Sequence, residues 1–125
     1  LLSDFKMAEK YLSISSKIKS FLNTQKRPTT VVFDKVKNLE TYNKSIAIRI
    51  PNDKFCISLI SKFGKPITST SVNFSGKNYP EYFKDIDQGI LNQIDYAVNL
   101  RRNEKLKNPS KIVKIKDDSI VTLRE

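Results

Sequence analysis

Residues 66–76 hold the densest run of small polar side chains in the chain, directly after an apolar stretch. Hydroxyls, an amide and a glycine on a turn can bind an anionic, oxygen-rich ligand, together with the backbone N–H groups beside them. The candidate site residues in this segment are Thr70, Ser71, Asn73 and Ser75. A hydroxyl-rich strand followed by a turn that satisfies its own backbone would explain the same residues, and both interpretations stay open at this point.

Three residues outside that segment could also contact a phosphate or a carboxylate. Arg49 interrupts an apolar strand pattern and would present a forked guanidinium, whereas Ser110 precedes a predicted strand and Arg124 ends the last one. Each also fits an ordinary structural role. Arg49 could point outward from its strand and pair with an acid. Ser110 could be an ordinary turn residue, and Arg124 could be a solvated arginine near the end of the chain.

The composition excludes several kinds of catalytic site. The chain has no histidine and one cysteine, Cys56, so it cannot form a Ser-His-Asp triad, a His-rich zinc site or a thiolate metal site. The carboxylates are scattered without a paired spacing, which argues against acid/base hydrolysis by two carboxylates. With three glycines, the chain has neither a Walker loop nor a dinucleotide fingerprint. We therefore expect no metal-ligating residues.

A net charge of +10 favours polyanionic partners, either a nucleic acid or a phosphate-bearing small ligand. A solvated lysine-rich surface accounts equally for many of the individual lysines. No apolar run approaches the roughly 18 residues that a membrane span needs, so we expect no membrane partner. A single cysteine fits a reducing compartment, and we expect the cytoplasm.

The hydrophobic periodicity predicts one α/β domain over residues 1–125. Helices are predicted over residues 4–24 with a break near 13–16 and over 53–63. A further short helix is predicted to start within 79–83, and a short helical turn over about 88–93. Strands are predicted over residues 29–33, 45–50, 66–71, 96–100, 111–115 and 120–124. Because several strands follow one another without a helix between them, the sheet should be mixed rather than purely parallel.

Several segments, in order, resemble the YrdC-type threonylcarbamoyl-adenylate synthase family. The most specific are residues 70–76 (TSVNFSG), similar to the family's Thr-Ser-Ala-Asn-x-Ser-Gly, and residues 45–51 (SIAIRIP), similar to its arginine-bearing strand. The others are residues 63–67 (FGKPI), 27–32 (RPTTVV), 109–113 (PSKIV) and 123–125 (LRE). The resemblance covers nearly the whole chain from about residue 3.

The resemblance implies a twisted mixed, largely antiparallel sheet with flanking helices and a basic concave face. It also implies a nucleotidyltransferase that makes threonylcarbamoyl-AMP from L-threonine, bicarbonate and ATP, usually with Mg²⁺. The product would go to the threonylcarbamoyl-transferase machinery that modifies tRNA. A carbamate oxygen attacks the α-phosphorus, so catalysis is mostly positioning and charge neutralisation. That chemistry suits a chain without histidine or paired carboxylates.

The same resemblance implies roles for the candidate residues. Thr70, Ser71, Asn73 and Ser75 would line a nucleotide and carbamate pocket. Arg49, Ser110 and Arg124 would contact phosphate, ribose or carboxylate groups.

The chain departs from the family pattern at several positions. The family has a further N-terminal part with a Lys-Arg … Lys-Pro signature, so these residues are expected to correspond to the C-terminal two-thirds of its domain. Full activity is then expected to need that part. Lys26 and Arg27 stand in place of Pro-Gly, and Val72 stands in place of alanine. Lys111 and Lys114 replace the usual threonine and aspartate.

Two other functions are compatible with this pattern. One is a non-catalytic module that binds double-stranded RNA or tRNA through the basic face of the same fold. The other is the related carbamoyl-transfer domain of hydrogenase maturation proteins, which sits in a much longer chain. Release of pyrophosphate that depends on threonine, bicarbonate and ATP would separate the synthase from the RNA-binding module.

Overall fold

The computed structural model describes residues 1–39, 45–106, 108–116 and 119–125. The chain divides into two compact units, one formed by Leu1–Thr68 with Pro109–Glu125 and the other by Ser69–Asn108. The first unit contains the sheet and the hydrophobic core, and the second contains short helical turns and extended segments. A single domain over residues 1–125 stays a prediction.

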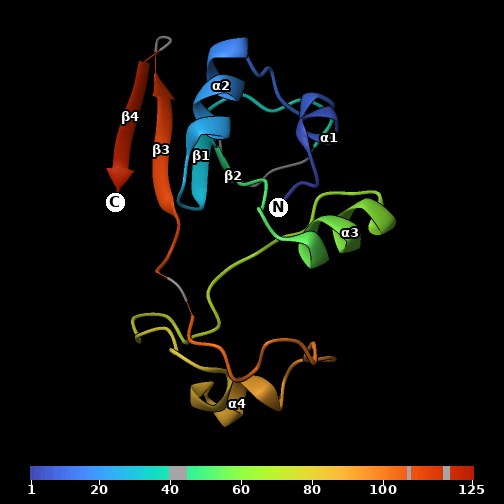
Figure 1. Cartoon of the computed structure of the whole chain (residues 1–125), viewed down its shortest axis with the longest axis vertical. Coiled ribbons are helices and arrows are strands. Elements are labelled where there is room, and N and C mark those ends of the chain that lie inside the picture. The colour runs from blue at the N-terminus through green and yellow to red at the C-terminus, as the bar shows by residue number, and fades with distance from the viewer. Residues whose placement is uncertain (40–44, 107, 117–118) are drawn as a thin grey trace. The chain divides into compact units, whose positions relative to one another are not determined.

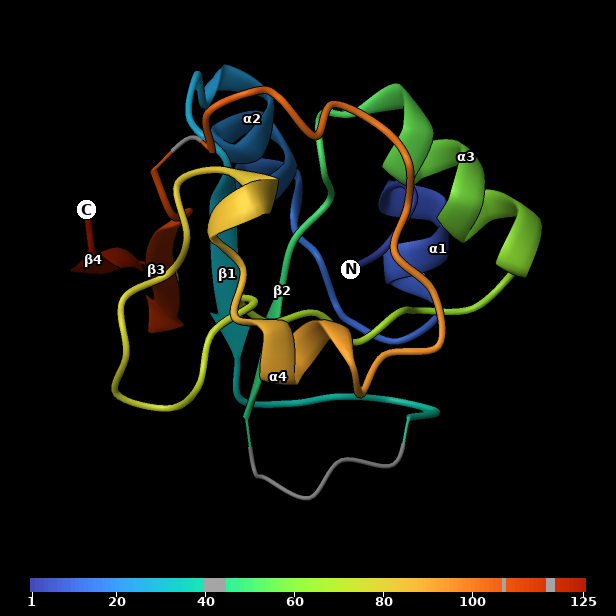
Figure 2. The same ribbon diagram turned by 90° about the horizontal axis from the view of Figure 1, so that it is seen from below.

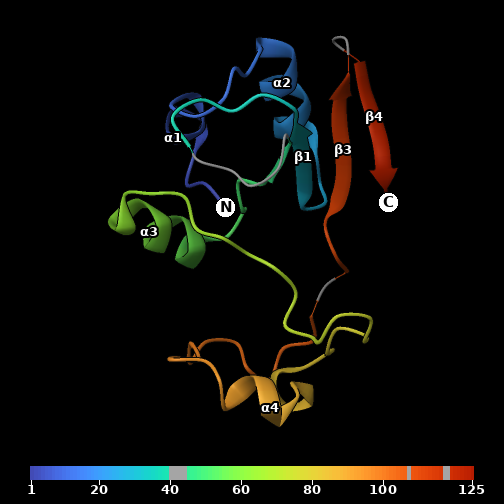
Figure 3. The ribbon, with the colours of Figure 1, turned by 180° about the vertical axis from the view of Figure 1, so that it is seen from behind.

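The first unit is built on one sheet of β-branched and aromatic segments. Its strands are β1 (Thr29–Phe33), β2 (Ile46–Ile48), β3 (Lys111–Lys116) and β4 (Ser119–Arg124), in the order β2-β1-β3-β4 (Figure 1). The pairs β1–β2 and β3–β4 are antiparallel, whereas β1–β3 is parallel. Figure 3 shows β4 beside β3 at the outer edge of the sheet. The prediction of a mixed, largely antiparallel sheet is confirmed; the turn predicted at 117–118 lies outside the described residues.

Two helices separated by a break precede β1, as the sequence predicts. Helix α1 (Phe5–Glu9) begins at Asp4, whose carboxylate accepts a hydrogen bond of 2.7 Å from the Met7 N–H. Helix α2 (Ser16–Thr24) begins at Ser15, whose hydroxyl accepts from the Ile18 N–H. Each cap satisfies one of the N–H groups that a helix start leaves without a partner, so the break falls where a new cap is available.

Helix α3 (Lys54–Phe63) follows the strand β2 and lies next to α1 in Figures 1 and 2. Asp53 caps its start by accepting from the Cys56 N–H at 2.9 Å. Gly64 ends it in the left-handed conformation with φ of 75°, which a residue with a side chain rarely adopts. Both boundaries agree with the prediction. No helix among the described residues is long and apolar enough to cross a bilayer.

Alternation along β1 separates the two faces of the sheet. Thr29, Val31 and Phe33 are buried, whereas Thr30 and Val32 are only half-buried, so the first three face the core. All the buried hydrophobic side chains of the described residues belong to the first unit: Leu2, Met7, Ala8, Leu12, Ile18, Val31, Phe33, Ile48, Ile60 and Val113. The helices α1, α2 and α3 thus share a core with one sheet face.

Acid should weaken the cap of α1. The hydrogen bond from the Met7 N–H, followed by that from the Ser3 hydroxyl, holds the pKa of Asp4 below its ordinary value of 3.8. A carboxyl whose pKa is lowered by folding contributes stability above the unfolded pKa and loses it as the pH falls through the folded pKa. We therefore expect the urea midpoint to drop less between pH 5 and about pH 3 in Asp4→Asn, because asparagine caps without titrating. Equal drops in both proteins would show that Asp4 does not carry this pH dependence.

The second unit forms a short 3₁₀ turn at Phe83–Asp85 and the helix α4 (Gln88–Leu91). The helical turn predicted near 88–93 is confirmed in shortened form. The short helix predicted to start within residues 79–83 forms as this 3₁₀ turn, which begins only at Phe83, so Pro80 is not in its first turn. Pro80 is the one buried residue among those described in this unit, so few apolar contacts favour regular structure there.

Two predicted strands are absent from the described residues. Residues 66–71 form no strand; the Ile67 N–H instead donates to the Leu1 carbonyl at 3.0 Å. Residues 96–100 form none either, and two of their backbone carbonyls accept from the Arg102 guanidinium instead of from a neighbouring strand. This guanidinium donates to the Ala97 oxygen at 2.7 Å and to the Val98 oxygen at 3.2 Å. Local β-propensity does not make a strand when no neighbouring strand accepts its backbone hydrogen bonds.

Candidate functional site

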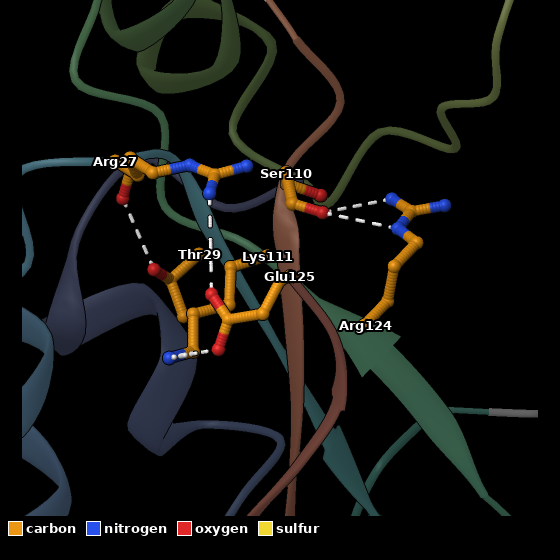
Figure 4. Close-up of polar contacts among 6 residues, drawn as sticks. All are labelled: Arg27, Thr29, Ser110, Lys111, Arg124 and Glu125. Atoms are coloured by element: carbon orange, nitrogen blue, oxygen red, sulfur yellow. Dashed lines mark hydrogen bonds and ion pairs between the residues drawn. The ribbon is translucent and has the colours of Figure 1, made fainter.

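The strand register places two arginines and a threonine in one row across the sheet. Continued by one residue past its last pair, the β1–β2 register puts Arg49 opposite Thr30. Thr30 is paired with Ile112 on β3, and Ile112 is paired with Arg124 on β4. Residues directly opposite each other share a sheet face, so Thr30 and Ile112, and Arg49 by the continued register, belong to the face that does not carry the core. The β3–β4 register shifts between Ile112 and Val113, and Figure 4 shows the Arg124 side chain on the other side of β3 from Lys111 and Glu125. At about 4.8 Å between strands, the row extends over about 14 Å.

Ser110 joins this row through both its side chain and its backbone. Its hydroxyl lies 2.8 Å from the Thr30 hydroxyl. Its carbonyl accepts from Arg124, at 2.8 Å from Nη2 and 3.3 Å from Nε (Figure 4). The Nη1 atom of the exposed Arg124 takes no part in these two contacts and can donate to an anion. The structure thus brings together two of the residues that the sequence singled out, Ser110 and Arg124.

Arg49 directly follows β2 and is half-buried. Its carbonyl accepts a hydrogen bond of 3.1 Å from the Leu2 N–H, which ties the backbone at this point. Its guanidinium forms no ion pair with any carboxylate in the described part of the chain. The described residues therefore do not support the alternative in which Arg49 points outward and pairs with an acid. A half-buried guanidinium without a carboxylate can accept an anionic ligand as its partner.

Two cations that depart from the family pattern lie on the other side of the sheet. Lys111 is opposite Thr29, which faces the core, and its Nζ lies 3.1 Å from Oε1 of Glu125 (Figure 4). The other carboxylate oxygen of Glu125 lies 3.9 Å from Arg27. Thr29 donates to the Arg27 carbonyl at 3.0 Å. These exposed ion pairs contribute little stability. They hold Arg27 and Lys111 beside Glu125, away from the row formed by Arg49, Thr30 and Arg124.

Asn73 closes a turn in the second unit and leaves one polar atom without a partner. Its Nδ2 donates to the carbonyls of Phe74, at 3.1 Å, and Lys77, at 2.9 Å. Gly76 allows the turn with φ of 78°. Asn73 Oδ1 is buried and accepts no hydrogen bond from the described residues. The amide nitrogen therefore acts as the turn interpretation predicts, while the buried oxygen keeps an acceptor that no described residue uses.

The other candidates of that segment are exposed. Thr70, Ser71 and Ser75 belong to the second unit with Asn73, and their hydroxyls face solvent. The strand predicted over 66–71, in which Thr70 and Ser71 would face opposite sides, does not form. Their contacts with a ligand stay predictions.

The described residues do not supply a metal site of the usual kind. No three Asp, Glu, Cys or His side chains lie together among them as a ligand set. The donors gathered in the row are hydroxyls and guanidiniums, and a guanidinium cannot coordinate a cation. These residues therefore do not fit a protein-bound Mg²⁺ ion.

Thr30 is the site residue that sequence reasoning did not single out. The signal was present, because Thr30 alternates with the apolar residues of a predicted strand and stands in the RPTTVV segment. Its significance depends on Ser110, which is 80 residues away in sequence and whose position no local pattern predicts.

Comparison with known proteins identifies the family. The family model for Sua5, YciO and YrdC proteins, described as "Telomere recombination", matches residues 1–125. The chain belongs to the Sua5–YciO–YrdC family. The resemblance inferred from residues 45–51 and 70–76 is thereby confirmed, and so is the mixed α/β fold expected of such a member.

A curated relative comes from Methanocaldococcus jannaschii and is named "Putative threonylcarbamoyl-AMP synthase". It is 38% identical over 82 residues, which cover 64% of this chain and 37% of the relative. The chain thus matches well under half the length of that protein. No solved structure matches the chain at a significant level.

Proposed function

We propose that the protein acts as a nucleotidyltransferase that makes threonylcarbamoyl-AMP from L-threonine, bicarbonate and ATP. The observation that carries this proposal is the row in which Arg49 and Arg124 flank the Thr30–Ser110 hydroxyl pair on one sheet face. Family membership and the name of the archaeal relative support it. In this proposal the product serves tRNA modification in the cytoplasm, through the threonylcarbamoyl-transferase machinery.

The proposed reaction needs positioning and charge neutralisation rather than an acid/base pair. The threonine amine condenses with bicarbonate to give a carbamate and water. A carbamate oxygen then forms a bond to the α-phosphorus of ATP while the bond from that phosphorus to the bridging oxygen breaks, and pyrophosphate leaves. Negative charge is spread over the phosphate oxygens in the transition state, which guanidinium and hydroxyl donors stabilise.

The residues divide these tasks by chemical type. Arg49 and Arg124 neutralise phosphate or carboxylate charge, and Ser110 donates to a phosphate, ribose or carboxylate oxygen. Thr70, Ser71, Asn73 and Ser75 contribute ligand hydrogen bonds, as the resemblance to the family implies. Mg²⁺ enters this proposal only as the ion that accompanies the triphosphate substrate.

The test is pyrophosphate release by the full natural protein. We expect release only when threonine, bicarbonate and ATP are all present, with threonylcarbamoyl-AMP identified by its mass. Arg27→Ala is the matched control, because this arginine lies away from the row and pairs weakly with Glu125 at 3.9 Å. Loss of release in Arg124→Ala but not in Arg27→Ala supports the proposal. Wild-type protein that binds ATP without releasing pyrophosphate under these conditions contradicts it.

RNA binding without catalysis is the second candidate function, favoured by the net charge of +10. Neutralisation of several phosphates would make the affinity for double-stranded RNA fall steeply with salt. Strong, salt-dependent RNA binding by a protein that does not bind ATP would favour this function over the synthase.

A further inference from the structure

Thr30 and Ser110 share a hydrogen bond in which one hydroxyl must be the donor. Their oxygens lie 2.8 Å apart, and both residues are half-buried, so water competes only in part for this contact. Either oxygen can be the donor in the absence of a ligand. Each hydroxyl has one proton and two acceptor lone pairs, so the direction of this bond decides where the Ser110 proton can point.

A bound anion decides that direction. Phosphate and carboxylate oxygens are acceptors, so Ser110 must donate its single proton to such a ligand. Ser110 then cannot donate to Thr30, and Thr30 must donate to Ser110. A hydroxyl that accepts one hydrogen bond is polarised and becomes a better donor in the next one.

We infer that Thr30 is a positioning residue whose hydroxyl donates to Ser110 Oγ and turns the Ser110 proton toward an anionic oxygen of a bound substrate, either a phosphate of ATP or the carboxylate of L-threonine. This inference rests on the proposed function. Thr30 acts through Ser110 rather than on the ligand itself. The parallel pairing of Thr30 with Ile112 keeps the backbone of β1 beside the start of β3, so the two hydroxyls stay within reach of each other.

The neighbouring residue Thr29 offers a matched control. Thr30→Val removes the hydroxyl but keeps the β-branched shape that suits a strand. Thr29→Val makes the same change one residue earlier, on the core face, where the lost hydroxyl donated to the Arg27 carbonyl. Thr30→Ser keeps the hydroxyl. Ser110→Ala removes the group through which Thr30 is inferred to act.

The experiment measures the dissociation constants and KM values for ATP and threonine, and kcat, in the full natural protein. For the substrate that Ser110 contacts, we expect Thr30→Val to raise the dissociation constant and the KM about tenfold, the loss typical of one hydrogen bond to a charged group. A change in the ATP values alone identifies a phosphate as the acceptor, a change in the threonine values alone identifies the carboxylate, and a change in neither overturns the inference. Thr30→Ser should stay within about threefold of wild type. Thr29→Val should lower the urea midpoint and leave ATP binding within about twofold.

A double-mutant cycle separates positioning from a merely structural role. In the Ser110→Ala background, Thr30→Val should weaken binding of the affected substrate by less than about twofold, because the hydrogen bond through Ser110 is already lost. The same tenfold loss in both backgrounds would overturn the inference. If wild type binds ATP and threonine but releases no pyrophosphate, the proposed function fails, while the coupling between Thr30 and Ser110 in substrate affinity still tests the inference. If neither substrate binds, both fail.

Discussion

Arg49→Ala should lower kcat/KM for ATP-dependent pyrophosphate release about a hundredfold while the protein stays folded. Arg49 is half-buried and pairs with no carboxylate in the described part of the chain, so its removal breaks no ion pair there. Loss of one donor to developing negative charge costs about 2.7–4 kcal/mol in the transition state. The free energy of unfolding should change by no more than about 1 kcal/mol, as for most substitutions outside the core. Steady-state kinetics and urea unfolding of the full natural protein measure the two effects separately.

Two further variants sharpen this prediction. Arg49→Lys keeps the charge but loses the planar fork, so its activity should fall between those of Arg49→Ala and wild type. Arg27→Ala removes a cation of the same type from the first unit and should leave the kinetics close to wild type. If Arg49→Ala keeps full activity and lowers only the affinity for RNA, Arg49 belongs to an RNA-binding surface and not to a synthase site.

Leu12→Ala should destabilise the first unit by about 3 kcal/mol. Leu12 is 2% exposed and belongs to the core cluster with Val31, Ile60 and Val113. Truncating a buried leucine loses its transfer free energy and leaves a cavity, at a cost of about 2–5 kcal/mol. Because small domains have about 5–15 kcal/mol of stability in all, this loss should produce a large shift of the urea midpoint.

Leu123→Ala is the matched control for this prediction. Leu123 is 56% exposed on β4, so the same truncation there should change the free energy of unfolding by about 0.5 kcal/mol or less. Equal effects of the two substitutions would contradict the burial of Leu12. The core that Leu12 stabilises also holds Val31 and Val113, which lie on the strands beside Thr30 and Ile112. Loss of Leu12 should therefore affect the row on the opposite face only through global unfolding.

The elements with strong local signals were the ones that sequence reasoning predicted correctly. Asp53 and Gly64 set the ends of α3 through a side-chain cap and a left-handed residue, and both effects depend only on neighbouring residues. Ser15 marks the start of α2 in the same way. The strand β1 follows from its β-branched residues and the burial of every second side chain.

The wrong predictions concern segments whose state depends on distant partners. Residues 66–71 and 96–100 have the composition of strands, yet neither forms one. Arg102 takes two carbonyls of the latter segment, and nothing in the local pattern indicates that contact. Strand formation needs a paired backbone, so composition alone overestimates the number of strands in this chain.

The sequence by itself determined the family, the mixed sheet and the identity of Arg49, Ser110 and Arg124 as candidates, because these follow from residue types in a recognisable order. Only the tertiary structure decided that these candidates share one sheet face with Thr30. That arrangement rests on the parallel pairing of β1 with β3 and on a hydrogen bond between residues 80 positions apart. Register between distant strands is set by which side chains the common core buries, and no local stretch of sequence contains that information.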